Sequence, residues 1–147
     1  MKVLIDADAC PVTRIAVEVC KRFGVDCVML CDTAHVLNLI GAETLIFDKG
    51  VDSVDFALVN RVLPGDIVIT QDYGLASMCL ARTARILHQD GWEYTEDNIQ
   101  GLLFQRHVSR KHRSSGGRIK GPPKRTAAQD KNFESALSLL LQQSVHG

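Results

Sequence analysis

The sequence lacks several features that would each define a class of protein. No apolar run approaches the roughly 20 residues needed to cross a bilayer. The opening residues, MKVLIDADACP, do not read as a signal peptide, because acids interrupt the apolar stretch after four residues. The five cysteines are odd in number and include no CxxC pair, which argues against a disulfide framework and a zinc knuckle. We therefore expect a cytosolic protein with reduced cysteines.

Acids are missing from one long stretch of the chain. Residues 98–129 contain eight Lys or Arg and no acid, whereas residues 1–97 contain 15 acids and eight Lys or Arg. The net charge of zero hides this separation, which suggests an acidic pocket and a basic arm on one molecule. Aromatic residues are also scarce in the basic stretch, so base stacking of the single-strand-binding kind is not indicated.

The 147 residues are enough for one domain with a buried core, and we treat 1–147 as a single domain. Short apolar runs alternate with segments of helical periodicity. This alternation predicts an α/β fold of three layers (α/β/α) around a mainly parallel sheet. The expected strands are 2–5, 25–30, 44–47, 67–70 and 85–87, and the expected helices are 11–23, 53–62, 75–83 and one capped by Thr95. A short helix within 33–42 and a turn at Asp90-Gly91 that pairs 92–94 back are also predicted.

The last third of the chain is predicted to be a loop followed by a helix. Residues 109–125 have no apolar periodicity and many Gly, Ser and Pro, which is typical of a basic flexible loop. Thr126 and Gln129 form a capping box for a helix over 126–142. Its expected buried side chains are Phe133, Leu137, Leu140 and Leu141. Because that helix needs a core to cover, the loop should be tethered at both ends.

Aspartates fall where the predicted strands end. Asp6 and Asp8 follow the first strand, Asp72 follows the fourth, and Asp52 and Asp55 begin the helix after the third. Ligands of open parallel sheets bind at the carboxyl ends of the strands, near the point where the strand order reverses. Close carboxylates repel one another, and oxygen-only ligands suit a hard cation, so we expect Mg²⁺ or Mn²⁺ here.

Each acid also has a purely structural interpretation. Asp52 and Asp55 would stabilise the start of any helix through its dipole. Asp32 and Asp48 fit ordinary loop acids, and Asp66 fits turn chemistry in Pro-Gly-Asp. The metal interpretation is favoured at Asp6 and Asp72, because each follows a strand that should be central.

The acid-free stretch is predicted to bind a nucleic-acid backbone. Flexible Lys and Arg side chains among glycines give salt-sensitive contacts to phosphates that are independent of base sequence. The alternative is a solvated loop that pairs with the acidic face of its own domain. The candidate nucleic-acid contacts are Arg106, Lys111, Arg113, Arg118, Lys120, Lys124 and Arg125.

Several motifs together resemble those of one bacterial family. They are IDADACP at 5–11, VDSVDFALVN at 51–60, PGDIVITQDYGLA at 64–76, the Glu93-Tyr94-Thr95 helix entry and SGGRIKGPP at 115–123. They resemble the YaiI/YqxD family over nearly the whole chain, and the family name carries no activity with it. That family is similar to PIN-like and NYN ribonuclease domains, which hold Mg²⁺ or Mn²⁺ with acids after the first strand, in a middle helix and after the fourth strand.

The resemblance implies roles for particular residues. Asp6 corresponds to the first acid, Asp52 or Asp55 to the helix acid, and Asp72 to the acid after strand four. Asp8 is a further position of the family motif. PIN-like sites often carry another acid about two residues after the Asp72 position, where this chain has Gly74 and Leu75. A fourth ligand would therefore have to come from Asp8.

Three functions are weighed against each other. In a nuclease, Asp6, Asp55 and Asp72 would bind one or two metals, while Asn60 and Thr70 orient water or phosphate. In a haloacid-dehalogenase-type phosphatase, Asp6 would be the nucleophile and Asp8 the acid. That superfamily usually has a second acidic pair late in the chain, however, and no acid occurs between 98 and 129. In a non-enzymatic RNA-binding module, the acids would be structural. We favour a nuclease acting on RNA rather than DNA, and a homodimer that joins two basic loops is compatible with the sequence.

Overall fold

The computed structural model describes residues 1–8, 10–32, 39, 41–47, 53–114 and 124–146, with the backbone alone described at 53, 106–114 and 145–146. The short helix predicted within 33–42 falls almost entirely outside these residues, as do Asp48 and Asp52. In the part of the chain so described, no helix is long and apolar enough to cross a membrane.

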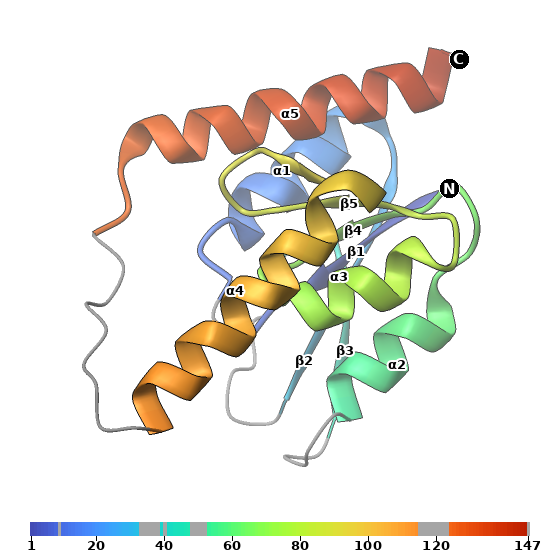
Figure 1. Ribbon diagram of the computed structural model, residues 1–147. Coiled ribbons are helices and arrows are strands. Elements are labelled where there is room, and N and C mark those ends of the chain that lie inside the picture. The colour runs from blue at the N-terminus through green and yellow to red at the C-terminus, as the bar shows by residue number, and fades with distance from the viewer. Residues whose placement is uncertain (9, 33–38, 40, 48–52, 115–123, 147) are drawn as a thin grey trace.

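A six-stranded sheet forms the centre of the molecule, in the order β3-β2-β1-β4-β5-β6 (Figure 1). The first five strands are parallel, and β6 runs antiparallel to β5. The strands are β1 (Lys2–Asp6), β2 (Asp26–Asp32), β3 (Glu43–Phe47), β4 (Ile67–Ile69), β5 (Arg85–Leu87) and β6 (Glu93–Tyr94). The prediction of a mainly parallel sheet is confirmed, and Trp92–Tyr94 does pair back through its last two residues.

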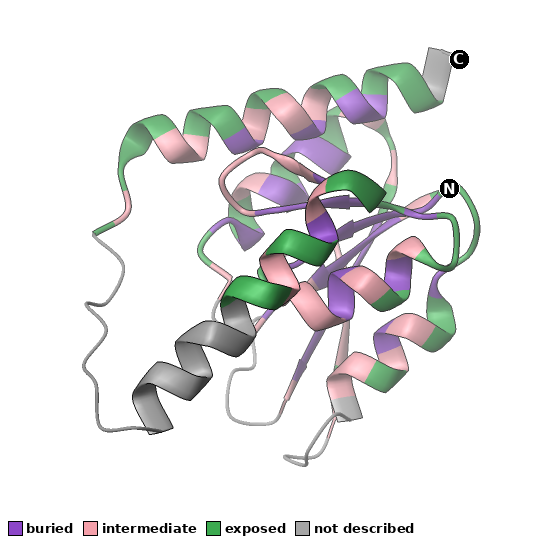
Figure 2. Cartoon of the chain, viewed as in Figure 1, coloured by how far each residue is buried: buried purple, intermediate pink, exposed green. Residues whose placement is uncertain are grey.

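Helices cover both faces of the sheet, which confirms the three-layer prediction. The helices α1 (Thr13–Phe23) and α5 (Ala127–His146) pack on the face to which Val3 and Ile5 point. The opposite face, to which Leu4 points, is covered by α2 (Ser53–Arg61), α3 (Tyr73–Leu80) and α4 (Glu96–Ser114). Figure 2 shows the buried strands lying between these two layers. β1 is buried on both faces because its apolar residues alternate between two helical layers.

The C-terminal helix follows the expectation drawn from its cap. The side chain of Gln129 accepts a hydrogen bond from Thr126 N at 2.8 Å, and Gln129 N donates to Thr126 Oγ1 at 3.3 Å. These reciprocal bonds form the predicted capping box. The four predicted core residues of the helix are buried, while the helix continues to His146 instead of ending at 142.

Two predicted boundaries are wrong. Residues 109–114 belong to α4 and not to a loop. Arg and Lys are good helix formers, and cations suit the carboxyl end of a helix whose first turn carries Glu96 and Asp97, so this stretch extends the helix without apolar periodicity. The helix predicted at 75–83 instead begins at Tyr73 and ends at Leu80, because Asp72 caps it earlier and Thr83 adopts a positive φ of 63°.

The cysteines behave as reduced, structural residues. All five are free thiols, and four of them are buried in the core. Cys20 and Cys79 lie on the apolar faces of α1 and α3, as their spacing predicted. Cys10 is only partly buried and precedes α1.

Candidate functional site

The sheet reverses its strand order between β1 and β4. From β1 the chain proceeds to β2 on one side, and from β4 it proceeds to β5 on the other. The carboxyl ends of these two central strands therefore flank the switch point, where ligands of such sheets bind. Asp6 is the last residue of β1, and the pairing of Ile5 with Ile69 places it beside Thr70, the residue after β4.

Thr70 connects two of the predicted acids. Its hydroxyl donates to Asp6 Oδ2 at 2.8 Å, and Thr70 Oγ1 accepts from the backbone N–H of Asp72 at 3.0 Å. Thr70 is buried, so these bonds lie in a poorly hydrated environment. The prediction that Thr70 orients other groups from beside the acids fits this position.

Asp72 is fixed by the helix that it begins. Its Oδ1 accepts from the backbone N–H groups of Gly74 at 2.9 Å and Leu75 at 3.2 Å, which caps α3. Asp72 thus has a structural role that holds its carboxylate at the switch point.

Asp6 is the electrostatic centre of the acidic group. Its pKa is raised to about 7 from an ordinary 3.8, chiefly by burial. The hydrogen bond from Thr70 lowers the pKa, while the charges of Asp55, Asp72 and Asp8 raise it further. Asp8, Asp55 and Asp72 are therefore near enough for their charges to act on Asp6, and we call these four residues (Asp6, Asp8, Asp55 and Asp72) the acidic cluster.

The other two members of the acidic cluster come from different elements. Both carboxylate oxygens of Asp8 lie 3.2 Å from the backbone nitrogen of Asp32, which ties residue 8 to the end of β2. Asp55 lies in the first turn of α2 and is partly buried. After burial, its charge is the next cause that raises the pKa of Cys79, in α3, to about 12, and α2 packs against α3.

Asn60 does not lie with the acidic cluster, and Asp52 cannot be compared with it. Asn60 is exposed, and it lies five residues beyond Asp55, which is about 7 Å further along the axis of α2. The structure does not bring it to Asp6. Asp52 lies outside the described residues, so its suggested part in the site is untested.

The donor set fits a hard divalent cation in kind, but the described side chains do not form a closed site. All donors of the acidic cluster are carboxylate oxygens, and their mutual repulsion is what a cation would relieve. In the described part of the chain, however, no three Asp, Glu, His or Cys side chains are arranged to hold one metal ion together.

Side chains missed from the sequence support the acidic cluster from the side of β5 and β6. Tyr94 is buried and donates from its hydroxyl to the backbone oxygen of Thr70 at 3.2 Å. Burial is the main cause that raises its pKa, and the charges of Tyr73, Asp72 and Asp6 add to it. Trp92 packs edge-on to Tyr94, with ring centroids 4.7 Å apart. The available signal was the aromatic pair that follows the Asp90-Gly91 turn.

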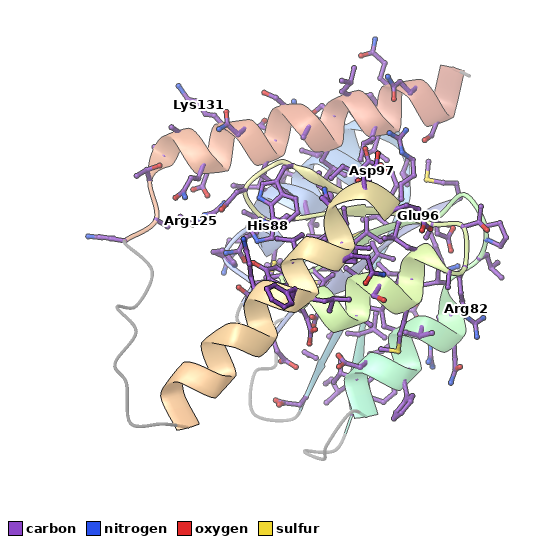
Figure 3. The ribbon with its side chains drawn as sticks, viewed as in Figure 1. Arg82, His88, Glu96, Asp97, Arg125 and Lys131 are labelled. Atoms are coloured by element: carbon purple, nitrogen blue, oxygen red, sulfur yellow. The ribbon has the colours of Figure 1, made fainter. Side chains whose placement is uncertain are left out.

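The predicted nucleic-acid contacts are described to different extents. Arg106, Lys111 and Arg113 lie on the last turns of α4, Arg118 and Lys120 fall outside the described residues, and Lys124 is exposed. The guanidinium of Arg125 forms ion pairs with Asp90 at 2.7 Å and Asp130 at 2.6 Å. Figure 3 shows it at the start of α5, on the side of the molecule that carries His88.

The fold and the acidic cluster define an α/β domain with carboxylates at the switch point of a mostly parallel sheet. Residues 4–143 match the family described as "Uncharacterized BCR, YaiI/YqxD family". The chain belongs to this family, which confirms the resemblance seen in its motifs. No solved structure matches the chain.

Relatives from several bacteria match almost end to end. A "UPF0178 protein" of Exiguobacterium sibiricum is 49% identical over 141 residues, which cover 96% of both chains. A "UPF0178 protein" of Natranaerobius thermophilus is 45% identical over 143 residues and 97% of both chains. The "UPF0178 protein CA_C2825" of Clostridium acetobutylicum is also 45% identical over 143 residues, covering 96% of this chain and 97% of that one. None of these names states an activity.

Proposed function

We propose that this protein is a nuclease that depends on a divalent metal, Mg²⁺ or Mn²⁺, and that its substrate is RNA. The observation that carries the proposal is the position of Asp6. It ends the central strand β1 at the switch point, and the charges of Asp8, Asp55 and Asp72 surround it closely enough to raise its pKa. A group of like charges at a ligand-binding edge is destabilising unless a cation joins it.

Asp6, Asp55 and Asp72 would hold the ion, and Asp8 would be the further ligand. When bound, a divalent ion at such a site lowers the pKa of a water that attacks the phosphodiester, and it stabilises the leaving oxygen. Because the acidic cluster is not closed in the described residues, small shifts of the acid side chains would accompany binding. Substrate phosphate oxygens would complete the coordination.

The surrounding residues hold the acidic cluster in place. Thr70 fixes the carboxylate plane of Asp6 through a 2.8 Å hydrogen bond. Tyr94 in turn binds the backbone oxygen of Thr70, and α3 holds Asp72 through its cap. Outer hydrogen bonds of this kind orient metal ligands and tune their basicity.

RNA is the proposed substrate because the chain supplies a concentrated positive charge after an acidic region. Lys124 and the basic residues 106–120 would neutralise backbone phosphates, which gives affinity without base specificity. Arg125 is not counted among these contacts, because all three of its guanidinium nitrogens donate hydrogen bonds within the fold.

Activity on RNA tests the proposal directly. A mixed-sequence RNA would be incubated with the protein in Mn²⁺, in Mg²⁺ and in EDTA, and the products separated by gel. We expect cleavage with either metal, none in EDTA, and loss of at least 100-fold in Asp6→Asn/Asp72→Asn, since Asn retains the cap of α3. Asp26→Asn is the matched control, because Asp26 is an exposed acid at the opposite end of β2.

The remaining outcomes separate the alternatives. Equal cleavage by the double variant and the wild type would overturn the nuclease proposal. Tight, salt-dependent RNA binding without turnover would assign the chain as an RNA-binding module. Trapping of a phosphoryl analogue on Asp6 would instead identify a phosphatase of the haloacid-dehalogenase type.

A further inference from the structure

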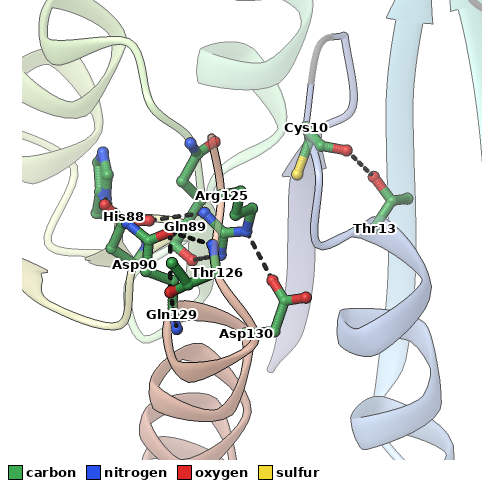
Figure 4. Close-up of polar contacts among 9 residues, drawn as sticks. All are labelled: Cys10, Thr13, His88, Gln89, Asp90, Arg125, Thr126, Gln129 and Asp130. Atoms are coloured by element: carbon green, nitrogen blue, oxygen red, sulfur yellow. Dashed lines mark hydrogen bonds and ion pairs between the residues drawn. The ribbon is translucent and has the colours of Figure 1, made fainter. Parts of the chain in front are cut away.

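All three nitrogens of the Arg125 guanidinium donate hydrogen bonds within the fold (Figure 4). Nε donates to Asp130 Oδ1 at 2.6 Å, Nη1 to Asp90 Oδ1 at 2.7 Å, and Nη2 to the backbone oxygen of Gln89 at 2.6 Å. Only 20% of the side chain is exposed. Three of the five N–H donors of the guanidinium are thus in use within the fold, which makes Arg125 a poorer partner for a phosphate than an exposed arginine.

The three acceptors join two distant parts of the chain. Asp130 lies in the first turn of α5, whereas Gln89 and Asp90 lie in the turn between β5 and β6. A second close approach holds the same parts together, because a Cβ on Gly91 would lie 2.6 Å from the backbone oxygen of Asn132. Arg125 therefore fastens the start of α5 to the β5–β6 turn.

The β5–β6 turn, to which Arg125 is bonded, also has stabilising contacts of its own. The ring of His88 stacks on Trp92 with centroids 4.2 Å apart, and His88 Nδ1 accepts from Asp90 N at 3.0 Å. The backbone oxygen of Trp92 accepts from His88 N at 2.8 Å. Contacts within the turn thus hold the backbone of Asp90 independently of the guanidinium, so the ion pair is preorganised.

The attachment lies on the edge that carries the acidic cluster. The β5–β6 turn begins at the carboxyl end of β5, and β5 is adjacent to β4. The charge of Arg125 acts on Cys10, which follows β1, and on His88. Trp92, Tyr94 and Thr70 then form a continuous series of contacts from the turn to Asp6.

We propose that Arg125 is a positioning residue and not a phosphate contact: with Asp90 and Asp130, it fixes the end of the basic stretch beside the edge that carries Asp6. Lys124, the exposed cation that precedes it, is then presented at that edge in a defined place. The part of this inference that concerns RNA rests on the proposed function.

The two roles of Arg125 predict different changes in RNA affinity for the variants Arg125→Lys and Asp90→Asn. If Arg125 contacted phosphate, Arg125→Lys would keep most of the RNA affinity, and Asp90→Asn would strengthen binding by removing an acid. If Arg125 is an anchor, Arg125→Lys loses the fork, and Asp90→Asn weakens binding although it makes the protein more positive. We expect both variants to raise the Kd and KM for RNA by about 5- to 10-fold with kcat within twofold, and the double variant to add little more.

Lys124→Gln is the matched control. It should weaken RNA binding and reduce the slope of log K against log salt by about one, as a phosphate contact does. Tighter RNA binding by Asp90→Asn, or wild-type binding by Arg125→Lys, would overturn the anchor.

Limited trypsin digestion tests the anchor without RNA. Trypsin must take the side chain of Arg125 into its own pocket to cut before Thr126, so the bonded guanidinium should protect that site. Mass spectrometry should show cleavage after Arg125 at least about 10-fold faster in Asp90→Asn than in the wild type. Equal rates would refute the anchor, whereas protection in a wild type that binds no RNA would preserve the anchor and refute the proposed function.

Discussion

Thr70 and Asp6, 64 residues apart in sequence, are joined by a hydrogen bond of 2.8 Å between a hydroxyl and a carboxylate oxygen. The bond spans the two central strands at the point where the strand order reverses. Among the causes that lie in the described residues, it is the one that lowers the pKa of Asp6, against burial and three neighbouring charges that raise it. The bond therefore favours the ionised form of the central carboxylate.

Removal of the Thr70 hydroxyl should weaken metal binding. In Thr70→Val, which keeps the shape of the side chain, the pKa of Asp6 should rise above about 7, so less carboxylate is ionised at neutral pH. We expect Mn²⁺ affinity at pH 7 to fall by about 10-fold, which is within the range for lost outer-shell partners. Isothermal titration calorimetry would measure it, with Thr70→Ser as the control that keeps the hydroxyl. Equal affinity in the valine variant would show that the bond does not tune Asp6.

The raised pKa of Asp6 makes stability depend on pH in a defined direction. Below pH 3.8 the folded and unfolded states both carry the proton, whereas between about pH 4 and 7 the folded state alone retains it. The free energy of unfolding should therefore fall as the pH rises through this window. Asp6→Asn cannot ionise, so above pH 7 in EDTA it should be more stable than the wild type, by roughly 1 to 4 kcal/mol.

Urea unfolding of the two proteins at pH 4 and pH 8 would measure this difference. The advantage of Asp6→Asn should be present at pH 8 and largely absent at pH 4. Asp26→Asn, at the exposed start of β2, should show no such pH-dependent advantage. A variant less stable than the wild type at both pH values would contradict the assignment of Asp6 as a strained carboxyl group.

The β5–β6 turn should tolerate no side chain at Gly91. The residue has a φ of 94°, and a Cβ there would meet the backbone of Asn132 at 2.6 Å, so Gly91→Ala combines backbone strain with a steric clash. We expect a loss of about 2 to 4 kcal/mol in the free energy of unfolding. Gly65→Ala is the matched control, since Gly65 has a similar φ of 88° and open space around its Cβ position. It should lose only about 1 kcal/mol in the same urea titration.

The sequence was informative where local patterns determine structure. Short apolar runs ending in Asp6 and Asp72 predicted central strands with acids at their carboxyl ends, because parallel strands need apolar residues on both faces. The Thr126–Gln129 box predicted the start of α5, because both of its bonds are local. The three-layer architecture then followed from the alternation of elements.

Features set by distant partners could not be read in the same way. The basic character of Arg125 predicted a phosphate contact or, alternatively, a pairing with the acidic face of its own domain. Its partner Asp90 lies 35 residues earlier, and only the folded chain shows which acid the guanidinium meets. The support that Tyr94 gives to Thr70 depends on a similar long-range approach. Residues 109–114 looked like a loop because apolar periodicity was absent, whereas charged helix formers at the end of an already nucleated helix need none.

The central pairing of β1 with β4 links the assembly of the acidic cluster to folding itself. Asp6 belongs to the first strand and Asp72 follows the fourth, so neither has its neighbour until more than sixty intervening residues have been placed. The pairing of β1 with β4 therefore also brings the acids together. The repulsion that the other acids exert on Asp6 opposes this pairing. A cation that relieves this repulsion would act on the folding equilibrium as a ligand of the native state, so the availability of the metal and the integrity of the sheet would vary together.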